Sequence, residues 1–183
     1  LSRPGPNLFQ RVFLIWRDLP VPVIAASHGH CFGAGMQLAL GADFRITTPD
    51  AQLAIMEARW GLVPDMALTV TLRGLVGLDV AKELTMTARA ISGTEAKALG
   101  LVSHVDQDPM TKALALANEI AARSPDAVLA AKRVLNAMVT QSESETLTLE
   151  KRWQRRLLLG ENFKIAGKKA KNPELNFVER EFD

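Results

Sequence analysis

Hydrophobic and polar positions in the first part of the chain change period repeatedly, which is typical of a mixed α/β fold. Residues 7–19 place apolar side chains at near-helical spacing, and Asn7 is a typical N-cap for this helix. Short apolar, β-rich runs predict strands at 21–27, 44–47, 53–56 and 101–105. Further helices are predicted at 36–43, 66–76, 79–87 and 94–99, with Asp79 and Thr94 as N-caps of the last two.

The strand pattern stops before Pro109, and helical periodicity continues beyond it. The predicted helices lie at 109–123, from Pro125 onward behind the N-cap Ser124, and at 143–159. The polar tail, 168–183, is expected to be less regular. The sequence therefore predicts an α/β domain over residues 1–108 and an all-helical region over residues 109–183.

Composition narrows the class of protein. The 183 residues are 48% hydrophobic and 23% charged with a net charge of +2, which is typical of a globular domain. This balance gives no reason to expect nucleic acid as a partner, and no apolar run reaches the ~18 residues of a membrane span. The single cysteine favours a reducing compartment, so we expect a cytoplasmic protein. Because the chain starts at Leu1 in a turn-like stretch, we expect it to be the interior of a longer protein.

A glycine-rich turn between a predicted strand and a predicted helix is the strongest local motif. Gly29, Gly33 and Gly35 let the backbone turn sharply and approach a ligand closely. The following helix presents unpaired N–H groups that can bind an anion or stabilise a developing oxyanion. Close packing of strand and helix explains the glycines equally well. The spacing matches neither G-x-G-x-x-G nor a P-loop.

Two carboxylates flank the apolar segment AIMEARWGLVPD. Glu57 follows a predicted strand, and Asp65 ends the segment. A poorly solvated carboxylate is a stronger base near neutral pH, so the pair could remove a proton from one carbon and return it at another. The expected apolar neighbours are Ile55, Met56, Trp60, Leu62 and Val63. The structural alternative is an ion pair of Glu57 with Arg59 or Arg45, with Asp65 capping the next helix.

A third motif, G-x-C-x-G at residues 29–33, resembles the thiol form of a nucleophile elbow. Cys31 would then be the nucleophile, with Asp65 or Asp79 and His104 as its partners. A cysteine with apolar neighbours is more often simply buried. This alternative therefore stays open but is not favoured.

Metal and phosphate binding have weaker signals. His28 and His30 lie close together, but no third ligand stands at a metal-like spacing, so we expect no metal site. The stretch 151–171 holds eight Lys or Arg residues against the single acid Glu161 and could receive phosphates. A solvated helix face is the favoured interpretation of this charge run.

Three segments together resemble the crotonase superfamily, the enoyl-CoA hydratase/isomerase family. Residues 22–65, PVIAASHGHCFGAGMQLALGADFRITTPDAQLAIMEARWGLVPD, carry the most specific likeness. ARAISGTEAKALGLVSHV and SPDAVLAAKRVLN are similar to later segments of the family, in the same order. The resemblance implies an α/β spiral of ββα units, with its N-terminal part missing here, followed by a helical region that forms trimers or hexamers.

The resemblance also implies an acyl-CoA thioester as substrate, with coenzyme A as part of it and no other cofactor. Two backbone N–H groups of the family hold the thioester oxygen as it becomes an oxyanion. One of them maps to Ala34, between Gly33 and Gly35, and the other lies on a segment N-terminal to this sequence. The substrate is expected to contact Phe32, Gly33, Gly35, Met56, Trp60 and Pro64.

The family's catalytic acids map unevenly onto this chain. Hydratases of the family use two glutamates, which correspond here to Gln37 and Glu57, and dienoyl-CoA isomerases carry an aspartate where Asp65 stands. An amide cannot take a proton from water, whereas double-bond migration needs only a proton shuttle beside a stabilised enolate. We therefore expect an isomerase, with Glu57 as base, Asp65 as opposing acid and Gln37 orienting substrate or water. A hydratase and a catalytically weak acyl-CoA-binding subunit are the alternatives.

Overall fold

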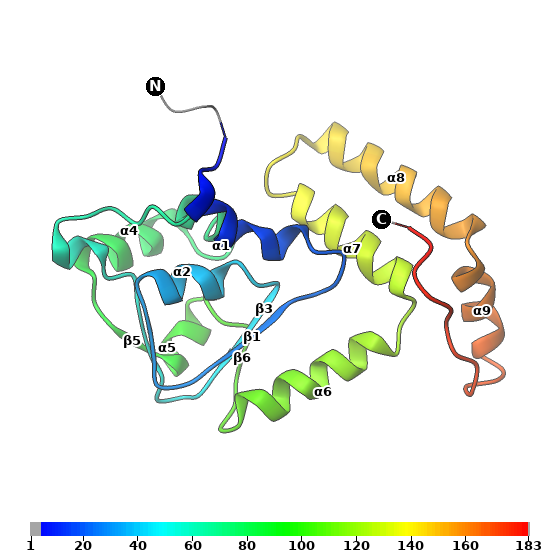
Figure 1. Cartoon of the computed structure of the whole chain (residues 1–183), viewed down its shortest axis with the longest axis horizontal. Coiled ribbons are helices and arrows are strands. Elements are labelled where there is room, and N and C mark those ends of the chain that lie inside the picture. Colours follow the sequence, from blue (N-terminus) through cyan, green and yellow to red (C-terminus); the bar gives the residue numbers. More distant parts are fainter. Residues whose placement is uncertain (1–4, 183) are drawn as a thin grey trace. The chain divides into compact units, whose positions relative to one another are not determined.

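The structure, a computed structural model, describes residues 5–182 and divides the chain into two compact units (Figure 1). One unit contains the chain up to residue 19 and residues 23–115, and the other contains residues 20–22 and 116–183. The division falls inside the helix α6 (Pro109–Ala121), so the boundary at residue 108 between the α/β domain and the helical region stays a prediction. None of the described helices is long and apolar enough to cross a membrane.

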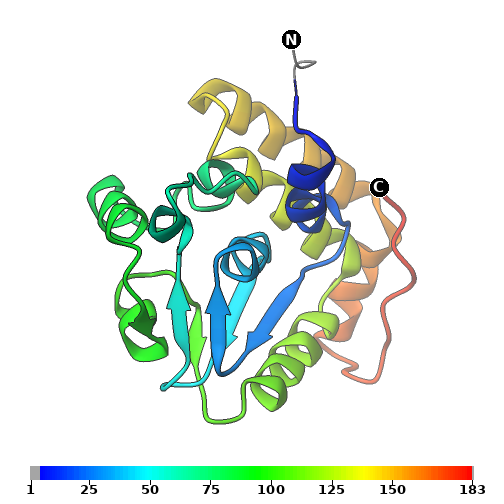
Figure 2. The ribbon, with the colours of Figure 1, turned by 60° about the vertical axis from the view of Figure 1, so that its left-hand side comes forward.

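The first unit holds two three-stranded sheets, ordered β1-β3-β6 and β2-β4-β5. The strands are β1 (Ile24–Ser27), β2 (His30–Phe32), β3 (Phe44–Thr47), β4 (Gln52–Ala54), β5 (Ile91–Ser92) and β6 (His104–Val105). The first four strands alternate between the two sheets, and every pair is parallel except β4 with β5. Ile24 on β1 pairs with Phe44 on β3, so the chain returns to this sheet after 20 residues and forms the neighbouring strand. Figure 2 shows these strands as arrows beside the short light-blue helix α2 (Ala34–Leu40).

Local signals mark the starts of three helices of the first unit, and the structure corrects the capping residue of two of them. In α1 (Leu8–Asp18) the side chain of Asn7 accepts from Gln10 N–H in a capping box, as the sequence predicts. The helix α4 (Leu78–Thr87) is capped by Gly77 rather than Asp79, which lies in its first turn. In α5 (Gly93–Ala98) the cap is the side chain of Ser92 rather than that of Thr94, because the strand β5 ends at the cap and delivers Ser92 there.

Residues 66–76 form less helix than their apolar residues suggest. Only α3 (Leu68–Thr71) is helical, after Ala67 in the left-handed region at φ 67°. Leu72 is buried in the core and Gly74 turns the chain at φ 80°. The apolar run here reflects packing against the core and not helical periodicity.

The core of the first unit is formed mainly by the β2-β4-β5 sheet and the helices of this unit. Its buried members are drawn from β2, α2, β4, α3, α4, β5 and α5 and the segments after them. The side chain of Arg45 on β3 is buried as well, and it donates to the carbonyl oxygens of Leu101 at 2.7 Å and Ala42 at 2.6 Å. Burial lowers the pKa of Arg45, although the charge of Asp43 opposes this effect. The Arg45 side chain therefore links the backbone at Ala42 to the backbone at Leu101.

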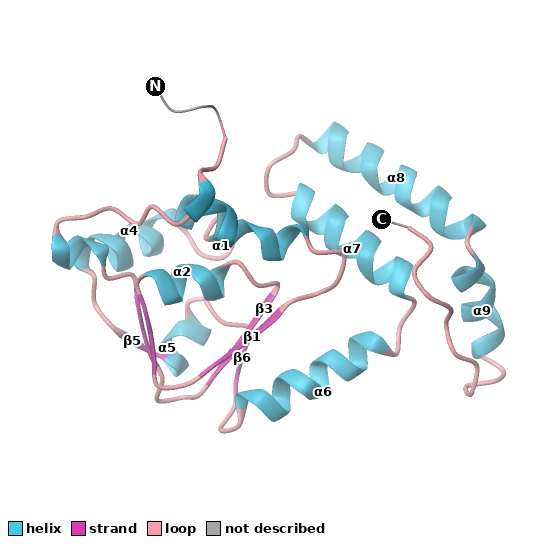
Figure 3. Cartoon of the chain, viewed as in Figure 1, coloured by secondary structure: helices cyan, strands magenta, loops and turns pink. Residues whose placement is uncertain are grey.

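The second unit is built from helices, and its described residues contain no β-strand (Figure 3). Its helices after α6 are α7 (Pro125–Ala137), α8 (Glu143–Leu159) and α9 (Glu161–Lys169). Ser124 caps α7 and Ser142 caps α8 through a capping box with Glu145, so the starts of both helices agree with the sequence prediction. The helix α9 is not predicted separately from the sequence, because its Lys residues belong to the charge run 151–171, which is interpreted as one solvated helix face.

A buried polar cluster ties the C-terminal segment to the helices of the second unit. Asp126 in the first turn of α7 is 1% exposed and accepts from Asn162 Nδ2 at 2.7 Å. Its other oxygen accepts from the backbone N–H groups of Glu181 at 2.8 Å and Phe182 at 3.2 Å. The ring of Phe182 then stands edge-on to Trp153, with 6.5 Å between the centroids. Asp126 therefore connects three separate segments of this unit.

Candidate active site

The glycine-rich turn joins β2 to α2 and exposes the start of that helix. Gly33 has φ 51° and ψ −120°, a conformation that suits glycine, and serves as the N-cap. Ala34 and Gly35 are exposed and are the first residues of α2, so their N–H groups have no acceptor within the helix. The expected oxyanion donor, Ala34 N–H, thus lies at an accessible point of the backbone.

Replacing Gly33 with alanine is expected to destabilise the protein by about 1–3 kcal/mol, because a side chain strains this conformation. The added Cβ would also lie 3.6 Å from Glu57 Oε1 and narrow the site. Gly35→Ala is the matched control, since its Cβ would meet nothing within 4 Å and its backbone is helical. Urea unfolding should show the control unchanged or slightly stabilised. Equal effects of the two changes would contradict the assignment of strain to Gly33.

Glu57 and Gln37 form the centre of the candidate site. Glu57 begins the 3-10 helix η1 (Glu57–Trp60), which follows β4 after Ile55 and Met56, and Gln37 lies on the buried face of α2. Gln37 Nε2 donates to Glu57 Oε1 at 2.6 Å. Glu57 Oε2 is buried and has no hydrogen-bond partner among the described residues. A buried carboxylate oxygen without a partner is unusual. Such an oxygen has a lone pair available to accept a proton from a ligand.

The structural alternatives for the two acids are not realised. Arg45 is bound to main-chain carbonyls, and no ion pair of Glu57 is found among the described residues. Asp65 is exposed, and α3 has Ala67 as its N-cap with no side-chain cap, so Asp65 does not cap that helix. The next backbone N–H after Asp65, that of Met66, donates to Gln37 Oε1 at 2.9 Å. Gln37 therefore joins Glu57 to the peptide that carries Asp65.

The expected apolar surroundings of Glu57 are only partly present. Ile55 is buried and Met56 half-buried, whereas Trp60 is 74% exposed, Leu62 64% and Val63 74%. These residues flank Gly61, which ends η1 in the left-handed region at φ 67°. Of the other expected contact residues, Phe32 at the end of β2 is half-buried and Pro64 is buried. The loop 60–63 thus presents an apolar surface next to η1 rather than a closed pocket wall.

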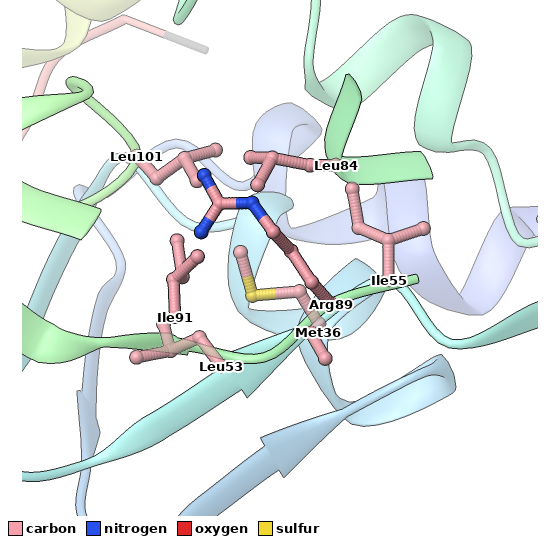
Figure 4. Close-up of a pocket in the computed structure, with 8 residues that line it drawn as sticks. Met36, Leu53, Ile55, Leu84, Arg89, Ile91 and Leu101 are labelled. Atoms are coloured by element: carbon pink, nitrogen blue, oxygen red, sulfur yellow. The ribbon is translucent and has the colours of Figure 1, made fainter. Parts of the chain in front are cut away.

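A small cavity lies among core residues of the first unit. Figure 4 shows Met36 of α2, Leu53 of β4 and the Arg89 side chain around it, together with Ile55, Leu84, Ile91 and Leu101. Its volume is about 10 Å³, which is room for about one water molecule and too little for an acyl chain. Arg89 is engaged by Glu83 at 2.9 Å and Glu95 at 2.7 Å. The cavity is accordingly part of the core, and no ligand is assigned to it.

The residues required for a cysteine nucleophile are not brought together. Cys31 is buried in β2, and His104 is exposed on β6, a strand of the other sheet. Burial raises the pKa of the Cys31 thiol, which lowers the thiolate fraction at neutral pH. The residues described by the structure also contain no cluster of three potential metal ligands.

Alkylation of Cys31 by iodoacetamide at neutral pH is expected to be at least about tenfold slower in the native protein than in urea, because the thiolate is the reacting form. The rate should keep increasing with pH beyond the range of an ordinary thiol, since the pKa is raised. Mass spectrometry of the modified protein measures both. Rapid alkylation of the folded protein would contradict this result and restore the nucleophile hypothesis.

Sequence comparisons identify relatives along nearly the whole chain. The signature of the family described as enoyl-CoA hydratase/isomerase matches residues 6–180. Human mitochondrial methylglutaconyl-CoA hydratase is 38% identical over 125 residues, which are 65% of this chain and 37% of that protein. Mouse mitochondrial Delta(3,5)-Delta(2,4)-dienoyl-CoA isomerase is 36% identical over 154 residues, which are 82% of this chain and 47% of that protein.

Solved structures agree with the sequence relatives. Enoyl-CoA hydratase from Bacillus anthracis has a TM-score of 0.86 at 32% identity, covering 90% of this chain and 65% of that chain. A Thermobifida fusca protein in complex with acetoacetyl-CoA has a TM-score of 0.77 at 36% identity, covering 81% of this chain and 59% of that chain.

The two sheets with alternating strands and the helical second unit define a fold of the crotonase superfamily, which confirms the expected fold class. Within that superfamily, the chain belongs to the enoyl-CoA hydratase/isomerase family. It spans about half the length of the curated relatives it matches.

Proposed function

We propose that the protein isomerises the double bond of an enoyl-CoA thioester, with Glu57 as the proton carrier. The observation that carries this proposal is the pairing of Gln37 with Glu57. The amide faces Glu57 at 2.6 Å, where a second acid would be needed to activate water, and it leaves Glu57 Oε2 without a partner. One carboxylate next to a stabilised enolate is sufficient for proton transfer between carbons.

In the proposed reaction, Glu57 removes a proton from C2 of a 3-enoyl thioester, and the thioester oxygen takes up negative charge. Ala34 N–H donates to this oxygen, and the resemblance implies a second donor from a segment N-terminal to this sequence. The electron pair forms the C2–C3 double bond, the C3–C4 double bond is lost, and C4 takes a proton. Glu57 supplies this proton after exchanging it in part with solvent, or Asp65 supplies another, so that charge and protons balance.

An acyl-CoA substrate is supported by the Thermobifida fusca relative in complex with acetoacetyl-CoA. In the proposal, Phe32, Gly33, Gly35, Met56, Trp60 and Pro64 contact the acyl part. Coenzyme A enters as part of the substrate, and we propose no further cofactor. The single cysteine agrees with a cytoplasmic location.

The test is product analysis with the protein translated from the complete reading frame. Incubation of a 3-enoyl-CoA in D2O should give the 2-enoyl isomer, with deuterium bound to carbon and no added water. Conversion of a 2-enoyl-CoA to a 3-hydroxyacyl-CoA without bond migration would contradict the proposal and favour the hydratase alternative, to which the human relative's name points. Binding without turnover would favour an acyl-CoA-binding subunit.

We also propose that the helical unit mediates assembly into a homotrimer or hexamer. Leu158 is 45% exposed, Leu159 82% and Phe163 53%, at the junction of α8 and α9. A cavity of about 160 Å³ lies beside them in the same unit. An exposed apolar patch of this kind typically marks an interface. Light scattering coupled to size-exclusion chromatography measures the mass, and a stable monomer would contradict the assembly.

A further inference from the structure

We propose that Gln37 is a positioning residue that orients the Glu57 carboxylate so that only Oε2 can exchange a proton with substrate. The inference rests on the proposed function for its consequence and on the hydrogen bonds of Gln37 for its geometry. It goes beyond the expectation that Gln37 orients substrate or water, because both ends of its amide are bound to protein atoms.

The chemistry of its partners fixes the orientation of the Gln37 amide. Met66 N–H can only donate, so the atom 2.9 Å from it must be the carbonyl oxygen Oε1 of Gln37. The Nε2 group then faces Glu57 Oε1, at 2.6 Å. In a flipped amide, the NH2 group would face the N–H donor of Met66, and the carbonyl oxygen would face the carboxylate oxygen of Glu57. Neither pair could form a hydrogen bond. Gln37 therefore has one stable orientation, with its donor directed at the carboxylate.

Burial makes this orientation rigid. The residue is 0% exposed, so water does not compete for either end of the amide. An amide moved from water to the interior loses free energy unless both ends find partners, and here each end has one. A short hydrogen bond from an amide to a carboxylate is also stronger than a neutral one. The Glu57 side chain is consequently held by the fully buried amide of Gln37.

The hydrogen bonds divide the two oxygens of Glu57 between two roles. Oε1 is engaged by Gln37, whereas Oε2 is buried and has no partner among the described residues. An amide neither gains nor loses a proton near neutral pH, so Gln37 does not compete with Glu57 as a proton carrier. The same amide holds the peptide between Asp65 and Met66. Gln37 thus sets the position of Glu57 and of the chain that carries the proposed opposing acid.

The test replaces Gln37 with methionine, which has a similar volume but can form neither hydrogen bond. We expect kcat for C2 proton exchange to fall by between about 10- and 100-fold, because small displacements of a catalytic group have effects of this size. KM should stay within about twofold, since the contacts with coenzyme A are unchanged. Leu40→Met is the matched control, because it introduces the same side chain at another buried position of α2. The control should retain parental kcat.

A crystal structure of Gln37→Met decides the positioning role independently of activity. We expect the Glu57 carboxylate to rotate or to occupy more than one rotamer. An unchanged Glu57 carboxylate, or a parental kcat, would overturn the inference. If the parent protein shows no proton exchange, the proposed function fails, and the Glu57 conformation alone then decides the positioning role. If Gln37→Met does not fold, the shorter amide of Gln37→Asn, which cannot reach both partners, replaces it with the same expectations.

Discussion

Replacement of Glu57 by glutamine should lower the rate of C2 proton exchange by between about 100- and 10,000-fold, the range that general base catalysis contributes. The amide has the shape of the carboxylate, and its oxygen can still accept the hydrogen bond from Gln37 Nε2. It cannot take a proton from carbon, however, so the fold and substrate binding should survive while the reaction slows by this factor. Deuterium incorporation into the thioester in D2O, followed by mass spectrometry, measures the rate directly.

Glu83→Gln is the control for this change, because it makes the same replacement at an exposed acid of α4 that pairs with Arg89. Its exchange rate should equal that of the parent. Urea unfolding of both variants shows whether any loss of rate follows from loss of folded protein. Exchange within threefold of the parent rate in Glu57→Gln would place the base on another residue, with Asp65 as the next candidate.

Much of the fold could be predicted where local chemistry decides it. The serine caps before Pro125 and Glu143 fix the starts of two helices, since the cap side chain binds the first turn whatever surrounds it. The strand β2 inside the glycine-rich turn was not predicted. Its three residues are extended because they pair with β4, and such pairing depends on the fold rather than on intrinsic propensity.

The candidate site shows the same division between local and long-range information. The sequence analysis singles out Glu57 and Gln37 as candidates, but it does not predict the hydrogen bond between them. That contact joins residues 20 positions apart, and 20 is also the offset between Ile24 on β1 and Phe44 on β3. The offset is not uniform, because His30 on β2 pairs with Gln52 on β4, 22 positions further along, so the repeat narrows the range of partners without identifying this pair. The exposure of Trp60, next to Gly61, could not be predicted either, since burial depends on the packing of distant segments.

The second large effect concerns stability and lies in the other unit of the chain. Replacement of Asp126 by alanine should destabilise the second unit by about 2–4 kcal/mol, because a buried donor that loses its partner costs about 1–3 kcal/mol and two half-buried N–H groups lose their acceptor as well. The donors are Asn162 Nδ2 and the N–H groups of Glu181 and Phe182. Hydrogen exchange of peptides from α7 to α9 during urea unfolding measures the loss in this unit alone. Glu119→Ala, an exposed acid of α6, should change stability by no more than about 0.5 kcal/mol.

A double-mutant cycle with Asn162→Ala distinguishes a specific cluster from a general sensitivity of the unit. Asn162 Nδ2 lies 2.7 Å from Asp126 Oδ2, and both side chains are 1% exposed. Removing Asp126 leaves this amide buried with one of its partners lost, whereas removing both residues leaves no orphaned amide. The double variant should therefore be more stable than the sum of the single effects predicts, by more than about 0.5 kcal/mol. Strict additivity would mean that Asp126 and Asn162 stabilise the C-terminal segment independently. The contribution of Asp126 would then come only from its hydrogen bonds with the N–H groups of Glu181 and Phe182.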